Sequence, residues 1–375
     1  MIHLNNAGTS FPKPPSVAAA VHATLQATPE RWPSIFAEAE ATVCQFLGIA
    51  DSTRFLFTSG CTSALAIVMN DLPWAEGDRI LTSSLEHHAL ARWLLPLARD
   101  RGVVHTASPY APGAPLDLDW LTRELARGRV RLVACTMASN VTGELLPVVE
   151  LARLAHAHGA LCLIDAAQTV GAMPVAVSAL GADILVFAGH KGPLGPHGIG
   201  GLYVAPTVQL SSPESVCELP APGTRPGIEP AGCAPMASYC DVGSANLAAA
   251  AGLAAGVRWL EERGLDHVRA HIQALTARLL DGLRALAGVR VVGAPGAEAR
   301  TGAVSMTFAD REPGVVEERL RAAGIVTRAG HHCASMAHAA LGTERAGTLR
   351  VSVGALSTPA DVDAALAALA TLVGN

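Results

Sequence analysis

Lys191 has the surroundings in this chain that best suit a reactive amine. It lies in Ile184-Leu-Val-Phe-Ala-Gly-His190-Lys191-Gly-Pro-Leu-Gly-Pro, where an apolar run ends in a turn rich in glycine and proline. An amine with an ordinary pKa of about 10.4 is a poor nucleophile until burial or a nearby cation lowers that pKa. The position at the mouth of a strand suits an amine that forms a Schiff base, although a lysine beside a strand end is usually solvated.

A carboxylate follows another apolar run 26 residues before Lys191. The stretch Leu161-Cys-Leu-Ile-Asp165-Ala-Ala-Gln168 predicts a buried strand that ends at Asp165. Two parallel strands joined by a crossover bring their carboxyl ends to one sheet edge, where ligands bind in α/β proteins. An aspartate there could pair with a protonated pyridine nitrogen and keep a pyridoxal ring electron-withdrawing. Alone, Asp165 could equally be a helix N-cap; together with Lys191 it favours a pyridoxal cofactor.

The two motifs resemble those of a known family. Asp165-Ala-Ala-Gln168 with Ala188-Gly-His190-Lys191 is similar to the class V, fold-type I enzymes that use pyridoxal 5'-phosphate (PLP), and the nearest branch is that of the cysteine desulfurases and selenocysteine lyases. The resemblance runs from Leu4-Asn-Asn-Ala-Gly-Thr-Ser-Phe-Pro-Lys-Pro to Leu349-Arg350-Val-Ser-Val-Gly. It implies an α/β fold, with a large domain built on a mainly parallel seven-stranded sheet and a smaller α+β C-terminal domain.

The resemblance also implies the contacts of the cofactor. Ser59-Gly60-Cys61-Thr62-Ser63 lies between a predicted strand and a predicted helix. The N–H groups at this helix start and the Thr62 hydroxyl would hold the phosphate; the alternative is an ordinary N-cap. Ala188 stands where many relatives carry a hydroxyl residue, so one phosphate hydrogen bond would be missing or replaced. The other expected contacts are His190 on the phosphate, Asn140 and Gln168 on the phenolic oxygen, Asp165 on the ring nitrogen, Cys61, and Ser244 on the phosphate of the partner subunit.

His87 follows a predicted strand in Leu85-Glu86-His87-His88-Ala89. In the family the first histidine of this pair stacks on the pyridine ring and can exchange protons with the substrate, a task for which an imidazole titrates in the useful range. The resemblance therefore implies a catalytic role for His87. A satisfied polar pair at a helix start is the alternative.

Cys333 lies near the C-terminus in Val326-Thr-Arg328-Ala-Gly330-His331-His332-Cys333-Ala334. Neighbouring imidazoles or Arg328 would favour its thiolate, but a core cysteine or a metal ligand is also compatible with the residues. Adjacent histidines and cysteine make a poor zinc site, and we predict no metal. In the desulfurases this loop carries the nucleophile that takes the substrate's sulfur as a persulfide. The resemblance implies that role for Cys333, and substrate contacts for Arg350, through bidentate pairing with the α-carboxylate, and for Arg328, Asn140 and Asn6.

The elements that must position these residues follow from the hydrophobic pattern. Alternating strands and helices predict a mainly parallel sheet with strands over 54–58, 79–83, 132–136, 160–165, 184–187 and 201–204, and helices over 16–28, 34–47 and 64–70. Residues 205–243 are rich in proline and glycine and predict a long active-site or interface loop. We expect a segment over 1–15 that packs with the small domain, a large PLP-binding domain over 16–245, a connecting helix over 246–265 and a small domain over 266–375.

Composition limits the classes of function. Half of the 375 residues are hydrophobic and 16% are charged, which predicts a large core and a surface partly buried in an oligomer. The net charge of -5 gives no footprint for nucleic acid or an anionic membrane. No apolar run approaches the ~20 residues of a membrane span. No signal peptide is apparent, and the eight scattered cysteines form no Cys-x-x-Cys pair, so we expect a reducing cytoplasm.

Two departures bear on the substrate. The segment over 26–33 is shorter than in most relatives, and Gly243-Ser-Ala-Asn246 replaces the usual Gly-Thr-Pro-Asn. His197-Gly-Ile-Gly-Gly201 resembles a dinucleotide loop but precedes a strand, so that function is rejected. We expect a homodimeric desulfurase that converts L-cysteine, or a related sulfur or selenium amino acid, to alanine and passes sulfur to an acceptor protein. The alternatives are a PLP-dependent C–S lyase or other eliminating or aminotransferase-type enzyme, and a PLP-binding scaffold without turnover.

Overall fold

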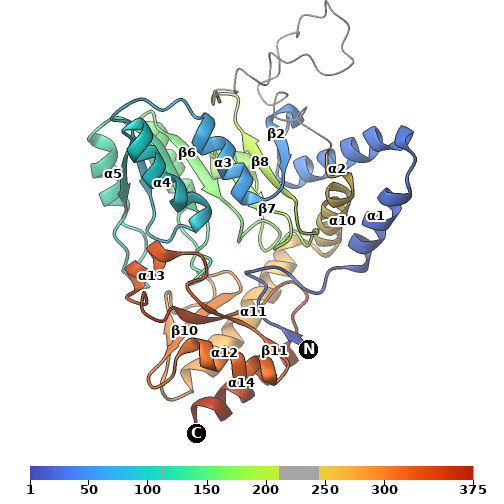
Figure 1. The fold of residues 1–375 in the computed structure, drawn as a ribbon, viewed down its shortest axis with the longest axis vertical. Helices are drawn as coiled ribbons and strands as arrows, with labels where there is room; N and C mark the ends of the chain where they lie inside the picture. The colour runs from blue at the N-terminus through green and yellow to red at the C-terminus, as the bar shows by residue number, and fades with distance from the viewer. Residues whose placement is uncertain (112, 211–244, 375) are drawn as a thin grey trace, which may run out of the picture.

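A seven-stranded sheet organises the N-terminal two thirds of the molecule (Figure 1). The computed structural model describes residues 1–111, 113–210 and 245–374. Within these residues the strand order is β2-β8-β7-β6-β5-β3-β4, parallel from β7 to β4, with β8 antiparallel to both of its neighbours. The strands are β2 (Phe55–Thr58), β3 (Arg79–Thr82), β4 (Val104–Ala107), β5 (Val130–Thr136), β6 (Leu161–Asp165), β7 (Ile184–Ala188) and β8 (Gly200–Val204).

The central strands are largely apolar, as expected of a sheet whose two faces are both covered by helices. All five residues of β7 are buried, and successive side chains contribute to cores on opposite faces. One core includes α3 (Cys61–Asp71) and α4 (His88–Arg101). The other includes α2 (Trp32–Phe46), α5 (Leu118–Ala126), α6 (Val148–Ala157), α7 (Val177–Leu180) and α10 (Leu247–Arg263), and α1 (Pro15–Gln26) packs on α10.

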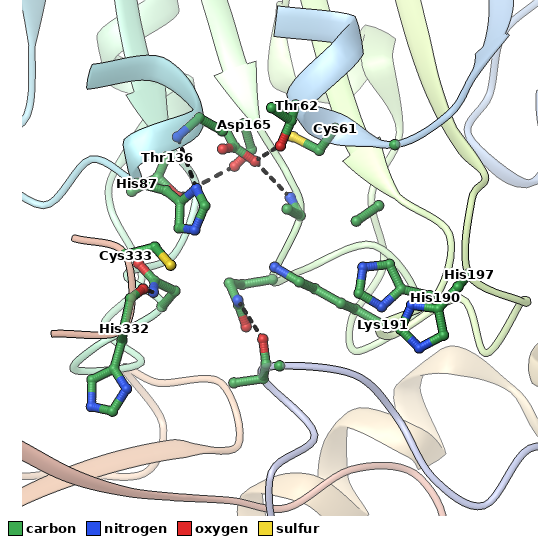
Figure 2. Close-up of a pocket in the computed structure, with 18 of the residues that line it drawn as sticks. Cys61, Thr62, His87, Thr136, Asp165, His190, Lys191, His197, His332 and Cys333 are labelled. Carbon is green, nitrogen blue, oxygen red and sulfur yellow. Dashed lines mark hydrogen bonds between the residues drawn. The ribbon is translucent and has the colours of Figure 1, made fainter. Parts of the chain in front are cut away.

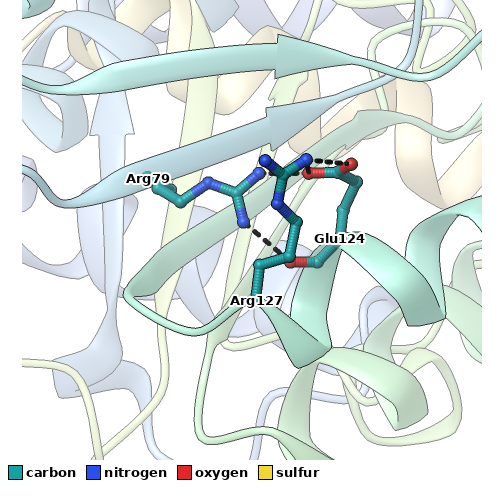
Figure 3. Close-up of polar contacts among 3 residues, drawn as sticks. All are labelled: Arg79, Glu124 and Arg127. Atoms are coloured by element: carbon teal, nitrogen blue, oxygen red, sulfur yellow. Dashed lines mark hydrogen bonds and ion pairs between the residues drawn. The ribbon is translucent and has the colours of Figure 1, made fainter.

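An ion-pair group joins α5 to the start of β3 (Figure 3). The guanidinium of Arg79 donates to the Glu124 carbonyl oxygen (2.7 Å) and to its carboxylate, and Arg127 donates to the same carboxylate at 3.0 Å. The hydrogen bond from Arg79 is the main cause that lowers the pKa of Glu124. Because Arg79 and Glu124 are mostly buried, this contact ties the helix to the sheet more firmly than an exposed pair would.

The C-terminal part is built on an antiparallel sheet of order β12-β13-β10-β9. Its strands are β9 (Val289–Val292), β10 (Ala303–Phe308), β12 (Arg328–Gly330) and β13 (Thr348–Ser352). A third core lies between this sheet and the helices α11 (Leu265–Arg284), α12 (Pro313–Ala322) and α14 (Pro359–Val373). The short helix α13 (Ser335–Leu341) follows the predicted nucleophile loop.

The N-terminal segment contacts both parts of the molecule (Figure 1). Its strand β1 (Ile2–His3) pairs in parallel with β11 (Ile325–Val326), and a bridge joins Asn5 to Ser352. The chain then reaches the turn of Lys191, where the Ser10 amide donates to the carbonyl of His190 at 3.2 Å. The first residues of the chain therefore help to fix the turn that carries Lys191.

The predicted fold class is confirmed, with local differences. Strand β4 was not predicted, because Val-His-Thr-Ala at a sheet edge has no continuous apolar run. Helix α3 begins at Cys61 rather than at residue 64. Most of the predicted loop over 205–243 lies outside the described residues. None of the described helices combines the length and the apolar character that crossing a membrane requires.

Candidate active site

A cavity of about 400 Å³ opens at the carboxyl ends of β5, β6 and β7 and is closed on its other side by the C-terminal part (Figure 2). Parallel strands place their carboxyl ends at this edge, where α/β proteins bind ligands. Its walls bring together most of the residues predicted from the sequence: Cys61, Thr62, His87, Asn140, Asp165, Gln168, His190, Lys191, Arg328, Cys333 and Arg350.

Asp165 and Lys191 lie on neighbouring strand ends, as the crossover argument predicted. Asp165 is the last residue of β6, and its Oδ1 accepts hydrogen bonds from the amide of Ala167 (2.9 Å) and from the thiol of Cys61 (3.4 Å). Burial raises the pKa of Asp165 and lowers the pKa of Lys191, and the charge of each opposes the shift of the other. A lysine amine with a lowered pKa is a better nucleophile and base than a solvated one.

The backbone around Lys191 is fixed from two sides. A Cβ at Gly192 would lie 2.2 Å from the carbonyl oxygen of Val170, so only glycine fits in this turn. From the N-terminal segment, the hydroxyl of Ser10 donates to the Lys191 carbonyl at 2.7 Å, and the Lys13 ammonium donates to the His190 carbonyl at 2.7 Å. Burial lowers the pKa of Lys13 to about 8. Sequence reasoning gave Ser10 and Lys13 no role, because their contacts join residues about 180 positions apart.

The N-terminus of α3 forms one end of the cavity. The helix begins after Gly60 without a side-chain cap, so its first N–H groups have no such acceptor, and Thr62 and Ser63 line the cavity beside them. Close backbone packing shapes this end, because a Cβ at Gly200 would lie 2.7 Å from the Cα of Gly60. The buried Nδ1 of His190 has no hydrogen-bond partner among the described residues. Together these groups suit an anion.

His87 and His88 have different partners, which separates their roles. His87 caps α4, and its Nδ1 accepts from the amide of Ala89 at 3.0 Å, an assignment that leaves the proton on Nε2. Burial, with a smaller effect of Lys191, lowers the pKa of His87 to about 3, so the ring is neutral near pH 7. His88 instead contacts the Ser335 hydroxyl at 2.8 Å.

Asn140, Gln168 and the guanidinium of Arg350 line the cavity toward the C-terminal part. Asn140 donates to the carbonyl of His332 at 2.7 Å, and Gln168 donates to the carbonyl of Ala7 at 3.0 Å. Arg350 is 2% exposed and donates to two neutral acceptors, the Asn140 carbonyl (2.7 Å) and the Asn5 side chain (3.0 Å). Burial lowers the pKa of Arg350 to about 9. A buried guanidinium with neutral acceptors is suited to pair with a carboxylate ligand.

The thiol of Cys333 faces Lys191 from the opposite side of the cavity (Figure 2). Cys333 and His332 have φ values of 56° and 48°, a left-handed conformation that costs roughly 1–2 kcal/mol per residue. The loop is held by the amide of His88, which donates to the Cys333 carbonyl at 2.7 Å, and Arg328 lies 3.8 Å from Sγ. The side chain is exposed, so this cysteine is not the core residue that remained an alternative.

The remaining predicted site residues are Asn6 and Ser244. Asn6 lies beside a neighbouring cavity of about 40 Å³, where its amide donates to the Ser352 carbonyl at 2.9 Å, and Asn5 is the residue that contacts Arg350. The proposed substrate contact of Asn6 therefore remains a prediction without support from the cavity. Ser244 lies outside the described residues. Among the described residues, no cluster of three metal-ligating side chains is found.

Glu86 is a buried acid behind this site that sequence reasoning left without a role. It is 0% exposed, and its carboxyl group accepts from the Ser83 hydroxyl and from the Thr136 amide at 3.0 and 3.1 Å. Burial is the main cause that raises the pKa of Glu86 from 4.5 to about 8. The folded chain therefore keeps a proton that the unfolded chain releases.

This proton makes stability depend on pH. The contribution of Glu86 is full below about pH 4.5 and is lost as the pH rises toward 8, by up to about 1.4 kcal/mol per pH unit. We expect Glu86→Gln, which mimics the protonated form, to flatten the fall of the unfolding free energy over this range. Urea unfolding of cofactor-free protein at several pH values measures it, with Glu150→Gln on the exposed face of α6 as the control. Parallel pH curves for the wild type and Glu86→Gln would contradict the assignment.

Comparisons with known proteins find similar sequences and folds over nearly the whole chain. The family model described as "Aminotransferase class-V" matches residues 15–365. The chain is 36% identical over 351 residues to a "Probable cysteine desulfurase" of Pseudomonas aeruginosa. This match covers 92% of this chain and 84% of that protein. It is 32% identical over 362 residues to a "Probable cysteine desulfurase" of Mycolicibacterium paratuberculosis. That match covers 93% of this chain and 50% of that protein. The chain thus spans about half the length of the latter relative.

Among solved structures, the fold is similar to that of an apo cysteine desulfurase from Thermococcus onnurineus NA1. The TM-score is 0.89 at 29% identity, and the match covers 100% of this chain and 94% of that one. The similarity therefore extends over both sheets and the N-terminal segment.

Proposed function

The chain belongs to the class V aminotransferase family, and we propose that it is a PLP-dependent desulfurase that removes sulfur from L-cysteine, or from a closely related sulfur or selenium amino acid, to give alanine. One observation carries the proposal. The Cys333 thiol and the Lys191 amine face each other across a single cavity, beside the buried guanidinium of Arg350. An amino acid held by Arg350 through its carboxylate would have a base on one side and a sulfur acceptor on the other.

The residues of the cavity fit PLP. The unsatisfied Nδ1 of His190 and the uncapped start of α3 suit its phosphate, and Asp165 suits its pyridine nitrogen. Lys191 would hold it covalently through Nζ, while Thr62, Cys61, His87, Asn140 and Gln168 would contact the rest of it. When bound, PLP supplies an electron sink for carbanions formed on the amino acid.

Each catalytic residue has a defined task in this proposal. Arg350 orients the substrate through its carboxylate, with Arg328 at the same side of the cavity, and the Lys191 amine moves the proton of the substrate's α-carbon. The neutral His87 presents its Nε2–H as a proton donor. The thiolate of Cys333 attacks the substrate's sulfur: an S–S bond forms as the carbon–sulfur bond breaks, and the carbon takes up a proton. The products are alanine and a persulfide on Cys333, so atoms and electrons balance.

We further propose a homodimer with a shared active site, to which Ser244 of each subunit would contribute, and an acceptor protein that takes the sulfur from Cys333. The low proportion of charged residues supports an additional buried surface. Since Cys333 lines the cavity and is exposed, an acceptor can approach it without opening of the fold. A reducing cytoplasm suits a free reactive thiol.

The identity of the product tests the proposed reaction. Purified protein incubated with L-cysteine is expected to form alanine, with sulfide released when a thiol reductant is present. Chromatographic quantification of alanine, pyruvate and sulfide distinguishes the alternatives. Pyruvate with ammonia in place of alanine would identify a C–S lyase, and no product from any sulfur or selenium amino acid, despite bound PLP, would identify a scaffold.

A further inference from the structure

His197 lines the same cavity but has no task in the reaction proposed above. Its ring lies parallel to that of His190, with centroids 4.5 Å apart and an interplanar angle of 26°. Figure 2 shows both rings beside the base of the Lys191 side chain, on the side of the cavity away from Cys333. The sequence pattern around His197 had suggested only a glycine loop of the wrong topology.

The position of the His197 ring is fixed by contacts from the N-terminal segment. Its Nε2 lies 3.3 Å from the hydroxyl of Thr9, which is also within 3.2 Å of the His190 carbonyl. Thr9 therefore contacts both histidine residues, and the stacked ring of His190 limits the remaining freedom. When the Thr9 hydroxyl donates to Nε2, the ring proton lies on Nδ1, which can then donate to another partner.

The charges around this pair favour an anion. Burial is the main cause that lowers the pKa of His190 to about 4. The charges of Lys191, His197 and Lys13, which are all basic, lower it further. Among the described residues that line the cavity, Asp165 is the only acid, and it lies at the pyridine end with Cys61. The N-terminus of α3 adds further positive potential. A dianionic group at this end would have several donors and no acidic neighbour.

The cavity wall has no side-chain hydrogen-bond donor at position 188. Ala188, the last residue of β7, lines the cavity with a methyl group and cannot donate a hydrogen bond. A cofactor phosphate has three terminal oxygens, and each accepts more than one hydrogen bond. His197 lies on the same wall, since it stacks on His190, two residues after Ala188.

We propose that His197 donates to the phosphate of PLP, in place of the hydroxyl that Ala188 lacks, and that it makes the site selective for the phosphorylated form of the cofactor. This inference rests on the proposed PLP-dependent function. A phosphate contact by His197 predicts that its loss weakens binding of PLP but not of pyridoxal, which has the same ring and aldehyde.

Affinity for PLP and for pyridoxal, which lacks the phosphate, tests the role. We expect His197→Ala to weaken PLP binding to the cofactor-free full chain about tenfold and to change pyridoxal binding by less than about twofold. Absorbance titrations with each ligand measure both. His197→Phe keeps a ring to stack on His190 without a donor and should match His197→Ala. His158→Ala, on an exposed histidine after α6, is the control and should match the wild type.

Different results would contradict the phosphate contact of His197, the selectivity of the site and the proposed cofactor. Equal losses for PLP and pyridoxal, or a His197→Phe variant that binds PLP like the wild type, would mean that the ring only packs on His190 and would overturn the phosphate contact. Unchanged PLP affinity in His197→Ala would also overturn it. A wild-type chain that binds pyridoxal and PLP equally well would overturn the selectivity, and one that binds neither would overturn the proposed cofactor as well.

Discussion

Cys333→Ala is expected to lower alanine formation from L-cysteine by roughly 10³-fold or more while PLP binding is retained. Two thiols line the cavity, but only Cys333 is exposed. The other, Cys61, donates to Asp165, and burial with that carboxylate raises its pKa well above the ordinary value. Burial and the neighbouring carboxylate therefore disfavour the Cys61 thiolate, which leaves Cys333 as the accessible thiol of the cavity. Alanine quantification together with the absorbance spectrum of the bound cofactor measures both parts of this expectation.

Two further variants make the result specific. Cys333→Ser keeps the size of the side chain and the contacts of its backbone, so it should be as inactive as Cys333→Ala. Cys44→Ala replaces a buried cysteine of α2 outside the cavity and should keep the activity. Alkylation and mass mapping after exposure to L-cysteine should find the extra sulfur on Cys333. Wild-type alanine formation in Cys333→Ala would assign the sulfur acceptor to another group and contradict the mechanism.

The local chemistry of the site was predictable because it depends on short patterns. Apolar runs identify β6 and β7; Asp165 ends the first of these strands, and Lys191 lies in the turn that follows the second. Parallel pairing of β6 with β7 then places both at one sheet edge, where they line the same cavity. The family and the fold that these motifs implied are confirmed by the family match and by the seven-stranded sheet.

Contacts between distant segments were not predictable. Nothing local in Asn5-Asn6 tells which amide will reach Arg350; the choice follows from the bridge between Asn5 and Ser352. The hydrogen bond of Ser10 with the Lys191 carbonyl depends in the same way on where the N-terminal segment crosses the sheet edge. His197 had a weak signal in its sequence, an imidazole in a turn just after the predicted catalytic lysine, but only the stacking on His190 gives that signal a meaning.

Lys191→Arg is expected to abolish both covalent cofactor attachment and turnover, again by roughly 10³-fold or more. The chain makes this test unusually clear, because its 375 residues include only two lysines, Lys13 and Lys191. Borohydride treatment of the wild type with PLP, followed by peptide mass mapping, should find the cofactor on Lys191 alone. An arginine keeps the positive charge near Asp165 but cannot supply a neutral primary amine, so charge and nucleophile are separated.

Lys13→Arg is the matched control for this labelling. Lys13 is half-buried and its amine has a lowered pKa, but its two hydrogen bonds go to the Ser10 hydroxyl and the His190 carbonyl, and it does not line the cavity. Arginine can donate to the same acceptors, so the variant should still carry the cofactor on Lys191. A cofactor found on Lys13 in the wild type would contradict the assignment. Attachment retained by Lys191→Arg would do so too, because Lys13 would then be the only lysine left to hold it.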